Sequence, residues 1–214
     1  MQIQGLRTIA RYMLPGPLRR QLRSMLGGRD VDWSRVVMNE RIERYVSSLN
    51  IARMDALEIS GNKWNNVPFR SYRSVAYSEY DVCHQPLAPE TWDIIFLEQV
   101  LEHVRAPRDA CRHVWQMLRP GGTFVVSTPF LIRVHDYPID CSRWTEMGMR
   151  YLLADAGFPV PAIQVESWGN LACTINNLLF VGERYLSRVH SLSNDPRYPL
   201  MVWAFAQKGA MEST

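Results

Sequence analysis

Three residues that could carry acid–base chemistry lie in one polar stretch of the chain. His135, Asp140 and Arg143 all fall between Pro129 and Trp144. An imidazole titrates near neutral pH, so His135 could take a proton from a ligand bound beside it. Asp140 could orient that imidazole while Arg143 lines a ligand pocket. Alternatively, Asp140 and Arg143 could form an ion pair that only holds the loop, and both interpretations stay open.

Further polar residues stand at the ends of expected strands. In an open parallel sheet, ligands bind beyond the carboxyl ends of the strands, where the strand order reverses. The loops that should meet there are 60–64, 78–81, 97–104 and 129–144. Glu98 and Gln99 follow one of these strands, and we expect them to face a cleft, although they could instead cap the short helix that follows.

The elements that must position these residues alternate along the chain from residue 55 onward. The expected strands are 56–59, 72–77, 92–97, 123–128, 160–166 and 201–206, and the expected helices are 34–49, 106–118 and 145–156. Apolar runs too continuous for a one-sided sheet, separated by helices and Gly/Pro turns, indicate βαβ units. We therefore predict an α/β fold with a Rossmann-like, doubly wound, mostly parallel sheet.

The first two crossovers of this predicted sheet are short. About 12 residues, including Pro68, separate the first two strands, and residues 77–81 leave no room for a helix. A sheet face that a crossover helix normally covers must then be covered by another element. The helix expected at 34–49 is the candidate.

The charge of the chain is concentrated at its beginning. Six arginines and no acidic residue fall in residues 1–29, and because the whole chain of 214 residues carries +3, residues 30–214 carry −3. We expect no nucleic-acid partner on these numbers. The predicted organisation is a basic amphipathic extension, 1–29, followed by one domain, 30–214.

The basic extension has two possible roles. Helical spacing of apolar residues over 5–26 predicts two short amphipathic helices, because Pro15-Gly16-Pro17 must interrupt a single one. The extension could pack on the domain as an arm, or it could contact an anionic membrane surface or a partner protein. No apolar stretch of 18 residues and no secretory signal is seen, and four cysteines without a C-x-x-C pair suit a reducing cytoplasm.

Four segments carry a resemblance to a known family. They are WDIIFLEQVLEHV (92–104), MLRPGGTFVVSTPF (117–130), HDYPIDCSRWT (135–145) and LLADAGF (152–158). In this order and spacing the sequence resembles the class I S-adenosylmethionine-dependent methyltransferases, in the branch that often accompanies polysaccharide and glycolipid synthesis. From the first to the last, the segments span residues 92–158, about a third of the chain.

The resemblance implies S-adenosylmethionine as cofactor and a hydroxyl or amine of a small molecule, saccharide or glycolipid as methyl acceptor. It implies His135 as base with Asp140 orienting it. Glu58 matches the acid that ends the family's first strand, and Ser60, Asn62 and Trp64 replace its usual glycines. The residues expected around the cofactor are Glu58, Ser60, Gly61, Asn62, Trp64, Glu79, Asp81, Glu98 and Gln99.

A second interpretation belongs to a different functional class. The replaced glycines and the shortened crossovers could mark a non-catalytic methyltransferase-like scaffold or partner subunit that has lost its cofactor. The polar loop 135–145 favours an enzyme, because a scaffold does not require such a loop beside a cleft. No group of residues has the spacing of a metal site, so no metal is expected.

Overall fold

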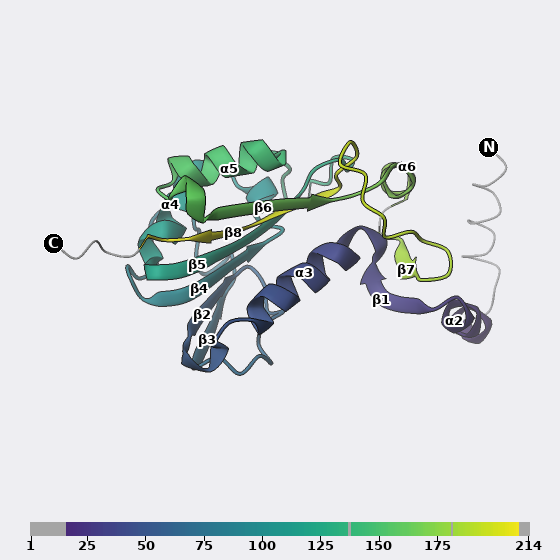
Figure 1. Ribbon diagram of the computed structural model, residues 1–214, viewed down its shortest axis with the longest axis horizontal. Coiled ribbons are helices and arrows are strands. Elements are labelled where there is room, and N and C mark those ends of the chain that lie inside the picture. Colours follow the sequence, from purple (N-terminus) through teal and green to yellow (C-terminus); the bar gives the residue numbers. More distant parts are fainter. Residues whose placement is uncertain (1–15, 137, 181, 210–214) are drawn as a thin grey trace.

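Strands and helices alternate along the chain, and the computed structural model describes residues 16–136, 138–180 and 182–209 (Figure 1). The strands are β1 (Gly28–Asp32), β2 (Asp55–Ile59), β3 (Ser71–Val75), β4 (Trp92–Glu98), β5 (Leu118–Pro129), β6 (Ile163–Trp168), β7 (Arg184–Leu186) and β8 (Met201–Gln207). The helices are α2 (Gly16–Met25), α3 (Val36–Ser47), α4 (Pro107–Met117), α5 (Glu146–Asp155) and α6 (Leu171–Leu179). Four short 3-10 helices are η1 (Trp33–Arg35), η2 (Ile51–Arg53), η3 (Leu101–His103) and η4 (Val160–Ala162).

Six strands form the central sheet in the order β3-β2-β4-β5-β8-β6. The strands from β3 to β5 are parallel, and β8 pairs antiparallel with both β5 and β6. The chain moves from β2 outward to β3 and then returns to the other side of β2 with β4, so strand order reverses between β2 and β4. The predicted doubly wound, mostly parallel sheet is confirmed.

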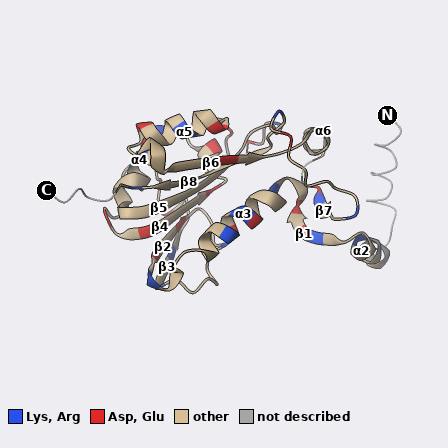
Figure 2. Ribbon diagram, in the orientation of Figure 1, with Lys and Arg blue, Asp and Glu red and all other residues tan. Residues whose placement is uncertain are grey.

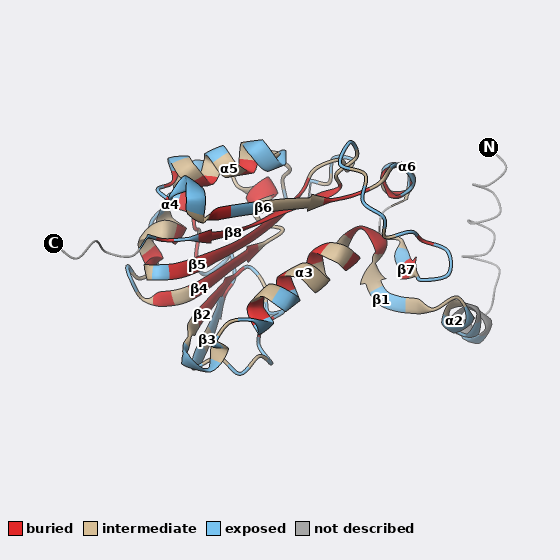
Figure 3. Cartoon of the chain, viewed as in Figure 1, coloured by how far each residue is buried: buried red, intermediate tan, exposed pale blue. Residues whose placement is uncertain are grey.

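Each face of the sheet carries its own apolar cluster. Along β4, Ile95 and Leu97 pack into the cluster that includes α4 and α5, whereas Ile94 and Phe96 pack into the cluster that includes α3. This alternation follows from the two-residue period of a strand. Figure 3 shows the central strands buried along most of their length between these layers.

The two short crossovers contain no helix. Residues 60–70 and 76–91, all of them described, form turns and irregular segments. Helix α3 covers the sheet face that these crossovers leave without a helix. Its Met38, Ile42 and Val46 are buried in the same cluster as Phe96. The prediction that the helix at 34–49 replaces a crossover helix is therefore confirmed, with the helix bounded at Val36 and Ser47.

Several elements differ from the sequence-based expectation. The strand expected from residue 160 begins at Ile163, because η4 occupies the preceding residues. Helix α6 and the small β1–β7 sheet are not predicted, since β1 and β7 are far apart in sequence and α6 does not bury its apolar face. The second predicted helix of the extension is α2, and the first falls outside the described residues. The domain boundary predicted after residue 29 falls within β1.

A network of charges closes the end of the sheet opposite the carboxyl ends of β2 and β4. The Asp55 carboxylate accepts hydrogen bonds from Arg70 Nε at 2.8 Å and from Arg119 Nη2 at 2.9 Å. Asp93 Oδ2 binds Arg119 Nη1 at 2.7 Å and the backbone N–H of Asp55 at 2.8 Å. The hydrogen bonds from Arg70 hold the pKa of Asp55 well below its usual range.

We predict that the stability contributed by Asp55 is lost on acidification. Its pKa in the folded state lies below the unfolded value of about 3.9, so the unfolded state takes the proton first and stability falls as the pH drops below about 4. Asp55→Asn should lower the free energy of unfolding at neutral pH by roughly 1–3 kcal/mol. The difference between wild type and variant, measured by urea denaturation, should narrow between about pH 5 and about pH 2.

Asp155→Asn is the matched control, because Asp155 forms an exposed ion pair with Arg108 at 3.4 Å. Such pairs contribute about 0–1 kcal/mol, so this variant should unfold nearly as the wild type does. A difference between wild type and Asp55→Asn that is independent of pH would contradict the assignment.

Candidate active site

A cleft lies where the strand order reverses between β2 and β4. Its volume is about 270 Å³, just below the range of about 300–1,000 Å³ for ligand pockets. The loop after β2, the end of β4 and the start of α3 contribute its walls. The lining residues are Arg35, Met38, Asn39, Glu58, Gly61, Asn62, Lys63, Glu98 and Gln99.

The carboxylate of Glu58 organises the turn that follows β2. Glu58 Oε1 accepts the backbone N–H of Lys63 at 2.9 Å, and Oε2 accepts the backbone N–H of Trp64 at 3.0 Å and the Tyr72 hydroxyl at 2.6 Å. The side chain is buried, so these three donors replace its hydration. The turn therefore bends around the acid, which holds the backbone of residues 61–64 at the edge of the cleft.

Gly61 is required by this turn. A Cβ atom at position 61 would lie 2.2 Å from Glu58 Oε1, far inside contact distance. The preceding residue, Ser60, adopts a left-handed backbone with φ of 59°, and its N–H donates to Val75 O at 2.7 Å. The one glycine left in the loop is thus the position at which the chain must pass against the acid.

Trp64 lies under the cleft and not inside it. Its side chain is 4% exposed and stacks on Phe96 with ring centroids 4.6 Å apart. The indole Nε1 donates to Glu98 Oε1 at 2.7 Å, while Lys63 Nζ lies 3.4 Å from Glu98 Oε2. The indole therefore covers the sheet face that a crossover helix would cover and fixes the carboxylate that lines the cleft.

The charges of the cleft suit the amino-acid part of the expected cofactor. Arg35 and Lys63 place positive charge in the cleft, and Glu98 and Glu58 place negative charge there. A zwitterionic methionine tail needs donors for its carboxylate and acceptors for its ammonium group. Gln99, with φ of 58° and its Nε2 3.2 Å from Ser127 Oγ, adds a polar wall. The residues present fit this part of S-adenosylmethionine.

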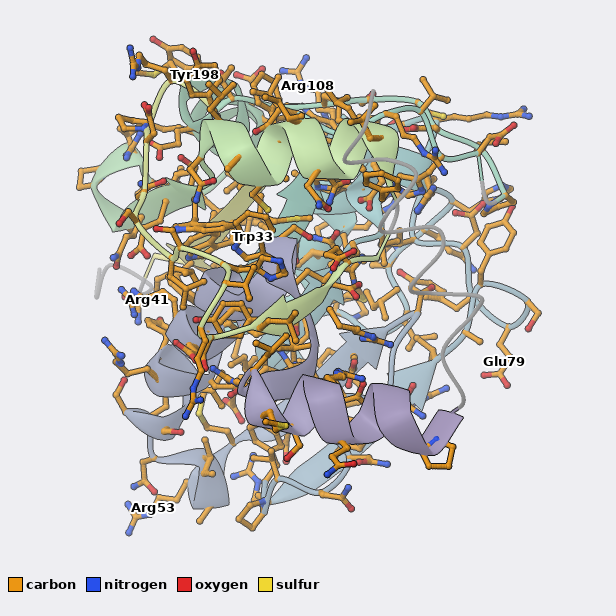
Figure 4. The ribbon with its side chains drawn as sticks, turned by 90° about the vertical axis from the view of Figure 1, so that its right-hand side faces the viewer. Trp33, Arg41, Arg53, Glu79, Arg108 and Tyr198 are labelled. Carbon is orange, nitrogen blue, oxygen red and sulfur yellow. The ribbon has the colours of Figure 1, made fainter. Side chains whose placement is uncertain are left out.

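Besides Trp64, three predicted cofactor residues lie apart from this lining. Glu79 is exposed in the loop after β3 and lies at the outer edge in Figure 4. Asp81 Oδ1 accepts the backbone N–H of Cys83 at 2.9 Å and so stabilises a local turn. Ser60 is exposed beside the cleft and is not among its lining residues. Binding of the nucleoside by Glu79 and Asp81 stays a prediction, because β3 ends at Val75 and turns precede both acids.

The loop that carries His135 is held by an ion pair. Arg143 binds both carboxylate oxygens of Asp140. Asp140 Oδ2 accepts the backbone N–H of His135 at 2.9 Å, so the contact runs to the main chain and not to the imidazole. The expectation that Asp140 orients the ring is corrected accordingly: Asp140 positions the backbone of His135, because Arg143 already occupies its carboxylate. The alternative of an ion pair that fixes the loop describes the observed contacts.

The His135 imidazole belongs to a polar cluster with the buried Glu102 and the half-buried His103. The three groups place ligand atoms within 4.8 Å of one another, and the two rings meet edge to face at 5.0 Å. Both Glu102 carboxylate oxygens are buried without a hydrogen-bond partner among the described residues, and burial raises the pKa of Glu102. His103 Nδ1 lies 2.5 Å from Ile139 O, which leaves its Nε2 toward Glu102 at 3.7 Å.

Two guanidinium groups act on this cluster. Arg35 and Arg143 favour the charged form of Glu102 and disfavour a proton on His135. Burial, followed by His103 and these arginines, lowers the pKa of His135, although Asp140 opposes the shift. One carboxylate and two imidazoles could hold a cation, and the adjacent guanidinium groups oppose both a bound cation and an added proton there. Gln99 lines the cleft and lies three residues before Glu102, so the cluster and the cleft are joined by one short segment.

Sequence reasoning missed the contribution of α3 and of Lys63 to the cleft. Arg35, Met38 and Asn39 come from the first turn of α3 and the residue before it. The sequence contained a signal for the contribution of α3, because a helix predicted to cover this sheet face can place its first turn near the carboxyl ends of the strands. Glu102 is not among the site residues predicted from the sequence, and it is the buried carboxyl of the cluster.

We predict that Glu58→Gln destabilises the protein more than the loss of one hydrogen bond would. A carboxamide offers only one acceptor oxygen, so its NH₂ group must face a donor from Lys63, Trp64 or Tyr72. The free energy of unfolding in urea should fall by about 1–3 kcal/mol. Tyr72→Phe, which removes one donor and leaves the carboxylate, should cost about 0.5–1.5 kcal/mol. Equal losses in both variants would refute the role given to Glu58.

Comparisons with known proteins agree with this geometry. Residues 41–126 match the family model of a methyltransferase domain. A tRNA U34 carboxymethyltransferase of Desulfotalea psychrophila is 40% identical over 45 residues, which are 21% of this chain and 14% of that protein. The chain therefore matches only a small part of that curated relative.

Solved structures share the fold at low sequence identity. A SAM-dependent methyltransferase from Archaeoglobus fulgidus is 11% identical with a TM-score of 0.53, over 81% of this chain and 94% of that one. The methyltransferase solved in complex with the Haloferax volcanii Trm112 activator is 12% identical with a TM-score of 0.50, over 85% and 96% of the two chains. Such identities establish the architecture alone.

The family match covers the second half of α3, the Glu58 turn, β3, β4, α4 and most of β5, and it leaves out Arg35, Met38 and Asn39 of the cleft. The comparisons show similarity to a methyltransferase domain over this segment and a fold shared with SAM-dependent methyltransferases.

Proposed function

We propose that the protein transfers a methyl group from S-adenosylmethionine to a hydroxyl or amine of a saccharide, glycolipid or related small molecule. The observation that carries this proposal is the position of Gln99, which lines the cleft and directly precedes the segment that carries Glu102 and His103. A cleft suited to the methionine tail thus adjoins a cluster suited to proton transfer.

The chain's own residues divide the work in this proposal. Lys63 and Arg35 bind the carboxylate of the methionine tail, and Glu98, fixed by the Trp64 indole, accepts hydrogen bonds from its ammonium group. Bound S-adenosylmethionine supplies an electrophilic methyl group on a sulfonium. The backbone of residues 61–64, held by Glu58, sets the depth at which the tail lies.

His135 serves as the base. Its lowered pKa keeps the imidazole neutral at neutral pH, so that it can accept the proton that the acceptor hydroxyl or amine loses. Asp140 and Arg143 position the loop through the His135 backbone. Alignment of the acceptor with the methyl group supplies most of the rate, because in-line displacement requires no covalent chemistry from the protein.

The charge of the body supports an uncharged or weakly charged acceptor over tRNA. Residues 30–214 carry −3, which opposes binding of a polyanion over a large surface. The similarity to the tRNA-modifying relative covers 45 residues only. A saccharide acceptor rests on the resemblance of the loop 135–145 to the glycan-associated branch.

We predict that His135→Ala reduces turnover by at least about 100-fold with little change in affinity for S-adenosylhomocysteine. The base must be neutral to act, so the acidic limb of the wild-type rate profile should lie below pH 6.5, the ordinary value for histidine. His84→Ala is the control, since its side chain is 81% exposed on the loop after β3. Loss of cofactor affinity in His135→Ala would reassign the residue to binding.

We also predict that Gly61→Ala weakens cofactor binding at least about ten-fold, because the new methyl group must displace the turn from Glu58. Calorimetry with S-adenosylhomocysteine measures the effect. Gly209→Ala is the matched control, since a Cβ there meets only Pro159 at an ordinary 3.6 Å. If the wild type fails to bind at millimolar ligand, the non-catalytic scaffold becomes the better interpretation.

A further inference from the structure

Helix α6 exposes its apolar face to water and buries polar residues on the opposite face. Its large aliphatic side chains Leu171, Ile175, Leu178 and Leu179, here called the α6 stripe, are 47–51% exposed. Its opposite face buries Cys173 together with the polar Thr174 and Asn176. A helix at the surface of a water-soluble domain normally has the reverse arrangement. An exposed apolar patch of this kind marks a surface that binds a membrane or another protein.

The α6 stripe is continuous with the end of the molecule that carries α2. Asn170, which caps α6, donates to Ser191 O at 3.3 Å, and Arg188 N donates to Leu26 O at 3.3 Å beyond the end of α2. Between these contacts lies Val189, which is 50% exposed. Figure 4 looks onto this end, with α6 above, α2 below and Trp33 between them.

Arginines flank the stripe. Helix α6 has no charged residue, and Figure 2 shows basic residues on the neighbouring β1 and β7. Arg29, Arg184 and Arg188 belong to this end and are exposed, and Arg29 pairs with Glu40 at 2.6 Å. Residues 16–29 contain four arginines, Arg29 among them, and no acid. The acidic residues of this end include Asp30 and Asp32, which pair with Arg184.

We propose that this end of the molecule docks on an anionic lipid bilayer. The α6 stripe enters the boundary between headgroups and acyl chains, and the surrounding arginines bind the anionic headgroups. Helix α2, which belongs to the extension predicted from sequence to contact a membrane or a partner, contributes to the same surface. No helix among the described residues is long and apolar enough to cross the bilayer.

The composition of the stripe favours lipid over a protein partner. It consists of leucine and isoleucine alone, whereas binding energy at protein interfaces concentrates in Trp, Tyr and Arg side chains, and Leu is under-represented there. A bilayer needs no shape complementarity, so a flat aliphatic row with basic flanks suffices.

Vesicle sedimentation with the full chain tests the proposal. The wild type should bind phosphatidylcholine vesicles that contain phosphatidylglycerol and should bind pure phosphatidylcholine vesicles much more weakly, with binding that declines as sodium chloride is added. Ile175→Ser combined with Leu178→Ser should reduce the partition coefficient about ten-fold or more. Arg188→Glu should reduce it several-fold on the anionic vesicles only.

Val160→Ser combined with Tyr151→Ser is the matched control. These apolar side chains are 53% and 64% exposed, on η4 and α5, and their loss should leave vesicle binding unchanged. The thermal transition of every variant shows whether it is folded. Failure of the wild type to bind anionic vesicles, or unchanged binding by the Ile175/Leu178 variant, would overturn the proposal. The measurement involves neither cofactor nor turnover, so its outcome is independent of the proposed methyl transfer.

Discussion

The buried carboxylate of Glu58 is the interaction on which the ligand cleft depends. It accepts two backbone N–H groups from the turn after β2 and one hydroxyl from β3, and so ties the turn to both neighbouring strands. The turn passes within contact of the acid only because position 61 has no side chain. Trp64 follows from this geometry, since the same turn directs its indole onto Phe96.

The loss of crossover helices is compensated by a small number of residues. A parallel sheet must be covered on both faces, because its strands are apolar on both sides. Here α3 and the Trp64 indole cover one face near β2 and β4, while Tyr80 and Val82 join the cluster on the other face. This solution brings the first turn of α3 to the carboxyl ends of the strands. The helix that takes the place of a crossover helix thereby supplies Asn39, and the residue before it supplies Arg35, to the cleft.

The two ends of the sheet have different electrostatic roles. At one end, Asp55 and Asp93 are neutralised by Arg70 and Arg119, so the charges there contribute to stability. At the other end, Glu102 is buried with no hydrogen-bond partner for its carboxylate among the described residues, beside two imidazoles. A buried acid without a partner costs stability, and such costs concentrate at functional sites.

The sequence by itself determined the strands of the central sheet along the chain, its mostly parallel character, the covering role of α3 and the loops that follow the strands. These features follow from local periodicity and from Gly/Pro punctuation, which act over a few residues. Tertiary structure alone decided that Trp64 supports the cleft from below, that Asp140 holds a backbone N–H instead of an imidazole, and that Glu79 and Asp81 lie apart from the cleft lining. It also decided that α6 turns its leucines outward. The direction of a side chain depends on contacts with residues distant in sequence, and neighbouring residues along the chain do not specify those contacts.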